Sequence, residues 1–167
     1  GAPMRCREAQ GAWAARAGLL VQQTDKAYAG ETAKSLRAGA AAKLNDRERR
    51  HLQAAQDWAE GRYNEGTSRY ARIAQENPRD LLALQYAHAG CFFLGLQAEL
   101  RDWPLQAMRA FSNGEDGYSY IQGMAAFGLE ECGDYARADI LGRQAVEADP
   151  RDGWAVHAVA HVNEMRG

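Results

Sequence analysis

The sequence predicts an all-α, right-handed α-solenoid of antiparallel helix pairs, and two observations lead to this fold class. The first is an internal repeat, in which the segment 61–95 recurs as 133–167 at a constant offset of 72 residues (133 − 61). An offset near twice the roughly 34-residue period of a helix-turn-helix unit indicates an array of stacked repeats. The second is composition, because strong helix formers are abundant and alternating runs of β-branched and aromatic residues are absent.

Proline, glycine and capping residues divide the chain into nine expected helices. The first two repeat poorly and rest on their helix-forming composition. Pro78 and Pro150 each stand at a joint between two helices, where a missing N–H and a fixed φ cost nothing. Asp102 is expected to cap a helix that tolerates Pro104 in its first turn, and 112–117 is the clearest loop. The expected helices cover residues 6–23, 28–43, 46–60, 63–76, 80–94, 103–111, 117–131, 135–147 and 152–166.

The expected organisation is a degenerate N-terminal helical pair at 4–45 followed by repeats over 46–167. Residues 1–3, Gly-Ala-Pro before Met4, resemble a scar left by tag cleavage. Every earlier first helix ends in a glycine that a second helix follows, so we expect the native protein to continue beyond Gly167. The apolar side of the last helix would then lack its neighbour and is a predicted surface for self-association, through Val156, Val159, Ala160 and Val162. The expected repeats are 47–80, 81–118, 119–152 and a half repeat at 153–167.

Charge, hydropathy and cysteine usage exclude several classes of function. A net charge of −2 over 167 residues argues against nucleic acid or an anionic membrane as a partner, because both need a basic face. No apolar run approaches the roughly 18 residues of a membrane span. The 3 cysteines form no CxxC pair and leave one unpaired in any disulfide scheme. This pattern is typical of reduced thiols in a cytoplasmic protein.

A family resemblance is carried by both copies of the repeat. Gly61, Tyr63, Gly66, Tyr70 and Pro78 resemble the tetratricopeptide consensus, and the second copy offers Gly133, Tyr135, Ala138, Ala145 and Pro150. The small residues let paired helices approach and the aromatic residues fill the space between them. One departure is Gly142, where an aromatic residue is usual.

A narrower resemblance covers about residues 46–167. It rests on the strings RERRH at 47–51, DLLAL at 80–84, GMAAFGLEE at 123–131 and WAVHAVAHVNEM at 154–165. These strings are similar to the tetratricopeptide repeat protein 38 family. The resemblance implies an α-solenoid and no established reaction.

In tetratricopeptide arrays the first helix of each pair lines a concave groove, and this property of the family predicts the binding residues. Steps of three and four residues keep such positions on one face of a helix. His88 falls instead at a small-residue packing position and is predicted to be a core histidine. The groove candidates are Glu48, His51, Gln85, Phe92, Tyr120, Phe127, Glu130, Trp154, His157, His161 and Glu164.

His157 and His161 stand one helical turn apart, a spacing that can chelate a metal ion. Ala158 replaces the glutamate of an HExxH motif, and a third ligand would have to come from Glu164 or from another repeat. The favoured interpretation is two groove-lining histidines that bond a partner, with no metal and no cofactor. Adjacent glutamates at 130 and 131 point about 100° apart and make a poor acid/base pair.

Two functions from different classes follow. The leading hypothesis is a protein- or peptide-binding solenoid, because no complete catalytic set is visible and solenoids offer extended concave surfaces. The alternative is a small-molecule or metal-binding enzyme, since tetratricopeptide peptide clamps line the groove with Lys, Arg and Asn. Here the groove offers His, Glu and aromatic residues instead.

Overall fold

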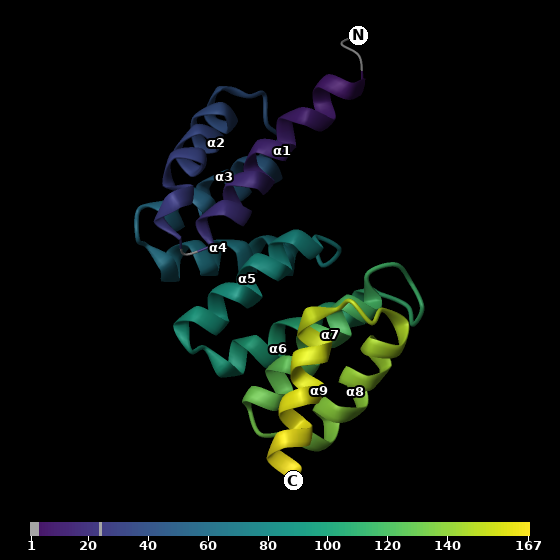
Figure 1. Ribbon diagram of the computed structural model, residues 1–167. Coiled ribbons are helices and arrows are strands. Elements are labelled where there is room, and N and C mark those ends of the chain that lie inside the picture. The colour runs from purple at the N-terminus through teal and green to yellow at the C-terminus, as the bar shows by residue number, and fades with distance from the viewer. Residues whose placement is uncertain (1–3, 24) are drawn as a thin grey trace. The chain divides into compact units, whose positions relative to one another are not determined.

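The computed structural model describes residues 4–23 and 25–167, and helices connected by short turns make up this part of the chain (Figure 1). No strand occurs within those two ranges. The all-α prediction is therefore confirmed, whereas the expected tag scar at 1–3 lies outside the described residues. The chain divides into two compact units.

The first unit contains the described residues up to Glu76 together with Leu82–Gly90. In it α1 packs against α2 and α3, and α3 packs against α4. Asn45 begins α3 through a capping box, in which Glu48 N donates to the Asn45 side chain and Asn45 N donates to the Glu48 carboxylate. The elements are α1 (Met4–Val21), η1 (Lys26–Tyr28), α2 (Ala29–Ala41), α3 (Asp46–Ala59), α4 (Tyr63–Glu76) and part of α5 (Leu81–Leu94).

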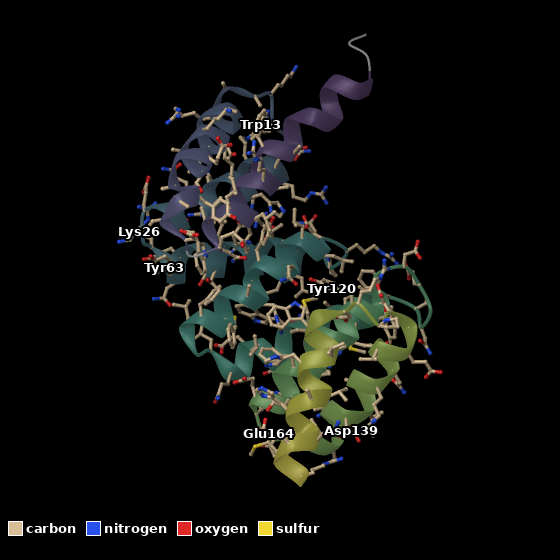
Figure 2. All side chains as sticks on the ribbon, viewed as in Figure 1. Trp13, Lys26, Tyr63, Tyr120, Asp139 and Glu164 are labelled. Atoms are coloured by element: carbon tan, nitrogen blue, oxygen red, sulfur yellow. The ribbon has the colours of Figure 1, made fainter. Side chains whose placement is uncertain are left out.

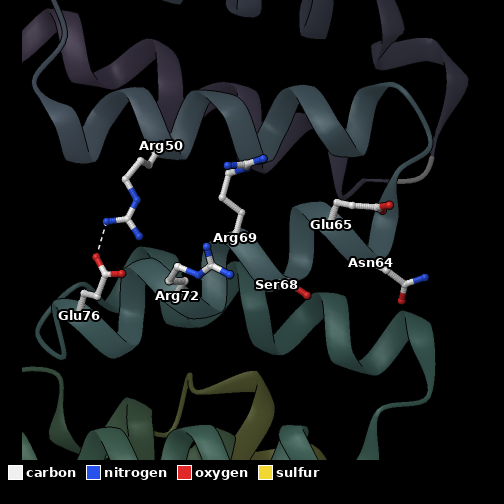
Figure 3. Close-up of a pocket in the computed structure, with 7 residues that line it drawn as sticks. All are labelled: Arg50, Asn64, Glu65, Ser68, Arg69, Arg72 and Glu76. Carbon is white, nitrogen blue, oxygen red and sulfur yellow. Dashed lines mark hydrogen bonds and ion pairs between the residues drawn. The ribbon is translucent and has the colours of Figure 1, made fainter.

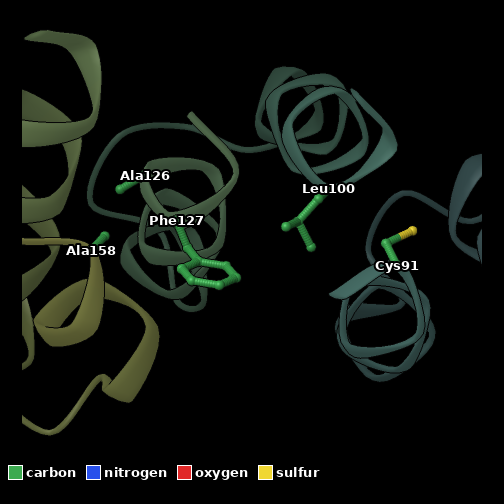
Figure 4. Close-up of a cluster of buried hydrophobic side chains, with 5 residues drawn as sticks. All are labelled: Cys91, Leu100, Ala126, Phe127 and Ala158. Atoms are coloured by element: carbon green, nitrogen blue, oxygen red, sulfur yellow. The ribbon is translucent and has the colours of Figure 1, made fainter. Parts of the chain in front are cut away.

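The second unit contains Asn77–Leu81 and Cys91–Gly167. Its central helix is α7, which packs against α6, α8 and α9, while α8 and α9 also pack against each other. A core cluster joins four of its helices through Cys91, Leu100, Ala126, Phe127 and Ala158 (Figure 4). The elements are the end of α5, α6 (Gln97–Ala107), η2 (Met108–Ala110), α7 (Tyr118–Glu131), α8 (Tyr135–Ala148) and α9 (Gly153–Arg166).

The internal repeat of the sequence is also a repeat of structure. The bounds of α3 and α7, of α4 and α8, and of α5 and α9 all differ by 72 residues, for example 63 and 135 for the starts of α4 and α8. The turns repeat as well, because Gly61 and Gly133 have φ values of 79° and 78°. After each of these glycines the next N–H bonds back to the carbonyl five residues earlier, the Schellman arrangement that ends a helix.

The helix between α5 and α7 differs from its expected position. A helix at 103–111 capped by Asp102 was expected, but α6 already begins at Gln97 and holds Pro104 in its interior. The Asp102 carboxylate accepts from Arg101 Nε at 2.6 Å, and the N-cap position of α6 is Leu96. The start signal is Gly95, whose φ of 69° ends α5 and lets the next helix begin two residues later. Pro104 is buried within α6 beyond its first turn, so the helix lacks the N–H that would bond back to the Leu100 carbonyl oxygen.

The apolar side of α9 is covered in part. Val162 is fully buried and packs with Leu129 of α7 and Ala138 of α8, so the expectation that it lacks a neighbour is wrong. The reason is that α7 and α8 both contact this helix. Val156 remains 45% exposed.

Candidate functional site

The groove candidates of the first unit have roles within its own fold. The Glu48 carboxylate is occupied by Asn45 N at 2.8 Å. His51 was expected to be accessible but is only 6% exposed, and its ring lies 5.7 Å from that of Tyr70 on α4. Its position on α3 turns it toward α4 rather than toward solvent. Gln85 is half-buried. His88 is completely buried, which confirms it as a core histidine.

In the second unit, the aromatic candidates gather around one buried ring. Phe127 of α7 is 1% exposed, and the rings of Trp154, His157 and Phe92 lie 5.0, 5.2 and 5.6 Å from it. Phe92 comes from the end of α5 and remains 46% exposed. Distances of this size are those of favourable tilted and edge-to-face aromatic contacts.

These rings surround a pocket of about 420 Å³, which is lined by Phe92, Tyr120, Phe127, Gly153, Trp154 and His157. We call it the aromatic pocket. Burial raises the pKa of Tyr120, and a hydrogen bond from Trp154 opposes that shift. Tyr120 therefore lines the pocket as a neutral phenol at physiological pH. Figure 2 places Tyr120 near the beginning of α9 and Glu164 near its end.

Farther along α9 the aromatic residues give way to titratable ones. His161 lies with its Nδ1 atom 3.4 Å from Oε1 of Glu130 on α7, and the His157 and His161 rings are 4.2 Å apart. Glu130 is 7% exposed, and its other oxygen, Oε2, is buried with no hydrogen-bond partner in the described part of the chain. Glu164 follows on α9 and is exposed.

The two copies of the repeat differ at these titratable positions. Going back 72 residues, Glu130 corresponds to Trp58, which is 5% exposed in the first unit. His157 and His161 correspond to Gln85 and Ala89. A carboxylate and two imidazoles therefore appear together in the second copy where the first has a packing tryptophan, an amide and a methyl group. Comparing the copies position by position would have separated these residues from the other groove candidates.

A second pocket, of about 610 Å³, lies in the first unit between α3 and α4, and its residues were not expected to form a site (Figure 3). Arg50 forms an ion pair with Glu76, and Arg69 Nε donates to Asp57 Oδ2 at 2.9 Å. Two of the three arginines are thus already paired with carboxylates. The lining residues are Arg50, Asn64, Glu65, Ser68, Arg69, Arg72 and Glu76.

Thiol chemistry finds little support in the described part of the chain. Burial raises the pKa of the Cys91 thiol to about 12, so the thiolate nucleophile is not formed at neutral pH. Cys132 donates from Sγ to the Gln97 carbonyl oxygen at 3.3 Å. Within residues 4–23 and 25–167 no three His, Cys, Asp or Glu side chains are grouped so as to hold a metal ion together.

Comparison with known proteins adds no assignment. No protein-family model matches the chain, and no solved structure matches it. The resemblance to the tetratricopeptide repeat protein 38 family therefore stays a prediction from the sequence. The helices of the described residues include none with the length and apolar character needed to cross a membrane.

Proposed function

We propose that this protein is a protein- or peptide-binding helical-repeat module of the tetratricopeptide type, related to the tetratricopeptide repeat protein 38 family, with its helix pairs stacked as a right-handed solenoid. The observation that carries the proposal is the aromatic pocket. A half-exposed Phe92 beside Trp154 and Tyr120 leaves apolar ring surface open to solvent. We also propose a cytoplasmic location, because the 3 cysteines of the sequence form no CxxC pair and leave one unpaired in any disulfide scheme.

The pocket suits one apolar or aromatic side chain of a partner segment. Burying such a side chain contributes about 1.5–3 kcal/mol, and anchors of this kind dominate the energy of many interfaces. The Tyr120 hydroxyl and the His157 ring stand among the lining residues and can bond the backbone of the same segment. The pocket is therefore expected to select an anchor residue with polar groups on either side.

Selection of short random peptides displayed on phage tests this proposal. The matched variants are Phe92→Ala, which opens the pocket, and Ile140→Ala, which removes a 58% exposed apolar side chain of the same unit that does not line it. Selected peptides are expected to share an aromatic or large aliphatic residue. Phe92→Ala should weaken their binding about tenfold or more, whereas Ile140→Ala should leave it unchanged.

Two outcomes would count against the proposal. One is a selection that yields no common apolar residue. The other is that the selected peptides bind equally well to the wild type and to Phe92→Ala, while circular dichroism shows that both proteins are folded.

A further inference from the structure

Glu130 is placed where a carboxylate is costly. Glu130 is only 7% exposed, and burying a carboxylate away from water costs free energy. It also lies in the last turn of α7, next to the negative end of the helix dipole, which further disfavours a negative charge. Its Oε2 atom has no hydrogen-bond partner among the described residues. The corresponding residue of the first copy, Trp58, shows that an apolar side chain can fill this position. A buried carboxylate that the fold does not require calls for a partner with positive charge.

His161 lies between the Glu130 carboxylate and the position of such a cation. A carboxylate oxygen accepts hydrogen bonds, so the 3.4 Å contact between Glu130 Oε1 and His161 Nδ1 favours the tautomer of His161 that carries its proton on Nδ1. The lone pair is then on Nε2. The side chain of His161 is 42% exposed, which leaves room for a ligand. A carboxylate that holds the far nitrogen of a histidine in this way is the usual second partner of a metal-binding imidazole.

His157 brings the second nitrogen. It is exposed, one helical turn before His161, and the two rings are 4.2 Å apart. Imidazole nitrogens bind Zn²⁺ at about 2.0–2.1 Å, so two rings that share one ion have centres about 5 Å apart. Opening the observed separation by about 1 Å requires only a side-chain rotation of the exposed ring.

We propose that His157 and His161 together bind one divalent transition-metal ion, such as Zn²⁺ or Ni²⁺, with Glu130 as the positioning residue that orients His161. Imidazole suits these ions. The proposed site uses two protein ligands, and water fills the other coordination positions of the ion. This agrees with the absence, among the described side chains, of three His, Cys, Asp or Glu residues grouped around one metal position. The site adjoins the aromatic pocket through His157 but does not depend on peptide binding.

Isothermal titration of the tag-free protein with Zn²⁺ and Ni²⁺ tests the proposal. The variants are His157→Gln and His161→Ala, which restore the residue types of the first copy, and Glu130→Gln. Glu131→Gln is the matched control, because it removes the adjacent, half-buried carboxylate of α7. One ion per chain is expected, with either histidine variant weakening binding more than tenfold, Glu130→Gln about tenfold, and Glu131→Gln not at all.

Two spectroscopic measurements separate this site from a merely structural role. Imidazole ¹⁵N signals should show the Nδ1–H form of His161 in the wild type and a mixture of tautomers in Glu130→Gln, before metal is added. The absorption of a Co²⁺ complex should lack a thiolate band. Binding weaker than about 1 mM, or binding unchanged in both histidine variants, or a thiolate band, would overturn the proposal.

Discussion

Asp57 and Asp152 are buried carboxylates whose surroundings shift their pKa values in opposite directions. For Asp57 burial would raise the pKa, but hydrogen bonds from Arg62 and Arg69 outweigh burial and lower it. For Asp152 burial raises the pKa more than hydrogen bonds from Ala155 N and Trp154 N lower it. Both residues are 6% exposed; hydrogen bonds from two arginines lower the pKa of Asp57, whereas burial is the dominant influence on the pKa of Asp152.

The two aspartates are therefore expected to affect stability with opposite pH dependence. Because the folded pKa of Asp57 is lowered, its contribution is present above the ordinary value of 3.8 and is lost as pH falls below it. Because the folded pKa of Asp152 is raised, its contribution is present below 3.8 and is lost as pH rises through the folded value.

Denaturant unfolding at several pH values checks this sign. Asp57→Asn should cost about 2 kcal/mol at pH 7 and progressively less below about pH 4. Asp152→Asn, which can still cap α9, should gain stability relative to wild type as pH rises from 3 to 7. Parallel curves for the two variants would contradict the assignment of the arginines as the cause.

The cysteines make a second prediction at the residue scale. Cys91 is completely buried with a pKa of about 12, whereas Cys132 is partly exposed. In the folded protein a thiol reagent at pH 8 should modify Cys132 and leave Cys91 unmodified, with Cys91 reacting only after denaturant is added. Mass spectrometry of the digested protein identifies the site, and early labelling of Cys91 would contradict the burial.

The close approach of the α6 backbone to α7 depends on a glycine, Gly128. A Cβ on Gly128 would lie 2.3 Å from the Leu100 carbonyl oxygen and 2.5 Å from Arg101 Cα, which are backbone atoms that cannot rotate away. Gly30 of α2 has the opposite surroundings, with nothing within 4 Å of an added Cβ. Both glycines lie within helices, so substituting alanine at each compares a site in tight contact with a neighbouring helix and a site with free space.

Alanine at these two glycines should therefore change stability in opposite directions. Gly128→Ala forces α6 and α7 apart and should cost about 2 kcal/mol or more. Gly30→Ala should be neutral or stabilise by up to about 1 kcal/mol, because alanine favours the helix. Thermal unfolding followed by circular dichroism measures both, and equal effects would show that α6 and α7 are not in tight contact.

At the scale of elements, the sequence predicts best where the signals are local. The ends of α4 and α8 follow from glycine and proline positions that recur in both copies. The predicted start of α6 was wrong because the string Asp-Trp-Pro at 102–104 resembles a helix start. In the structure the Asp102 carboxylate accepts a hydrogen bond from Arg101 within the helix. The burial of individual side chains was harder to predict than the helix ends. His51 and His157 occupy equivalent positions in the predicted groove, but His51 faces Tyr70 whereas His157 faces solvent.

For the molecule as a whole, comparison of the two repeat copies predicts that Glu130 lowers stability, because the first copy has the apolar Trp58 at the same position. Glu130→Leu is the test of that cost, because leucine is close in size and removes a buried charge. We expect the free energy of unfolding to rise by about 1 kcal/mol, whereas Glu131→Leu should not raise it. A loss of stability in Glu130→Leu would mean that the Glu130–His161 contact holds α7 and α9 together.

The central claim is that the second unit carries the binding surface, and mapping by nuclear magnetic resonance tests it most directly. A peptide selected against the protein would be added in steps to a ¹⁵N-labelled sample. The account predicts that the largest shifts fall on the amides of Phe92, Tyr120, Phe127, Trp154 and His157. Shifts concentrated instead on the corresponding first-copy residues Ala55, Leu82 and Gln85, or on the arginine-lined pocket, would contradict it.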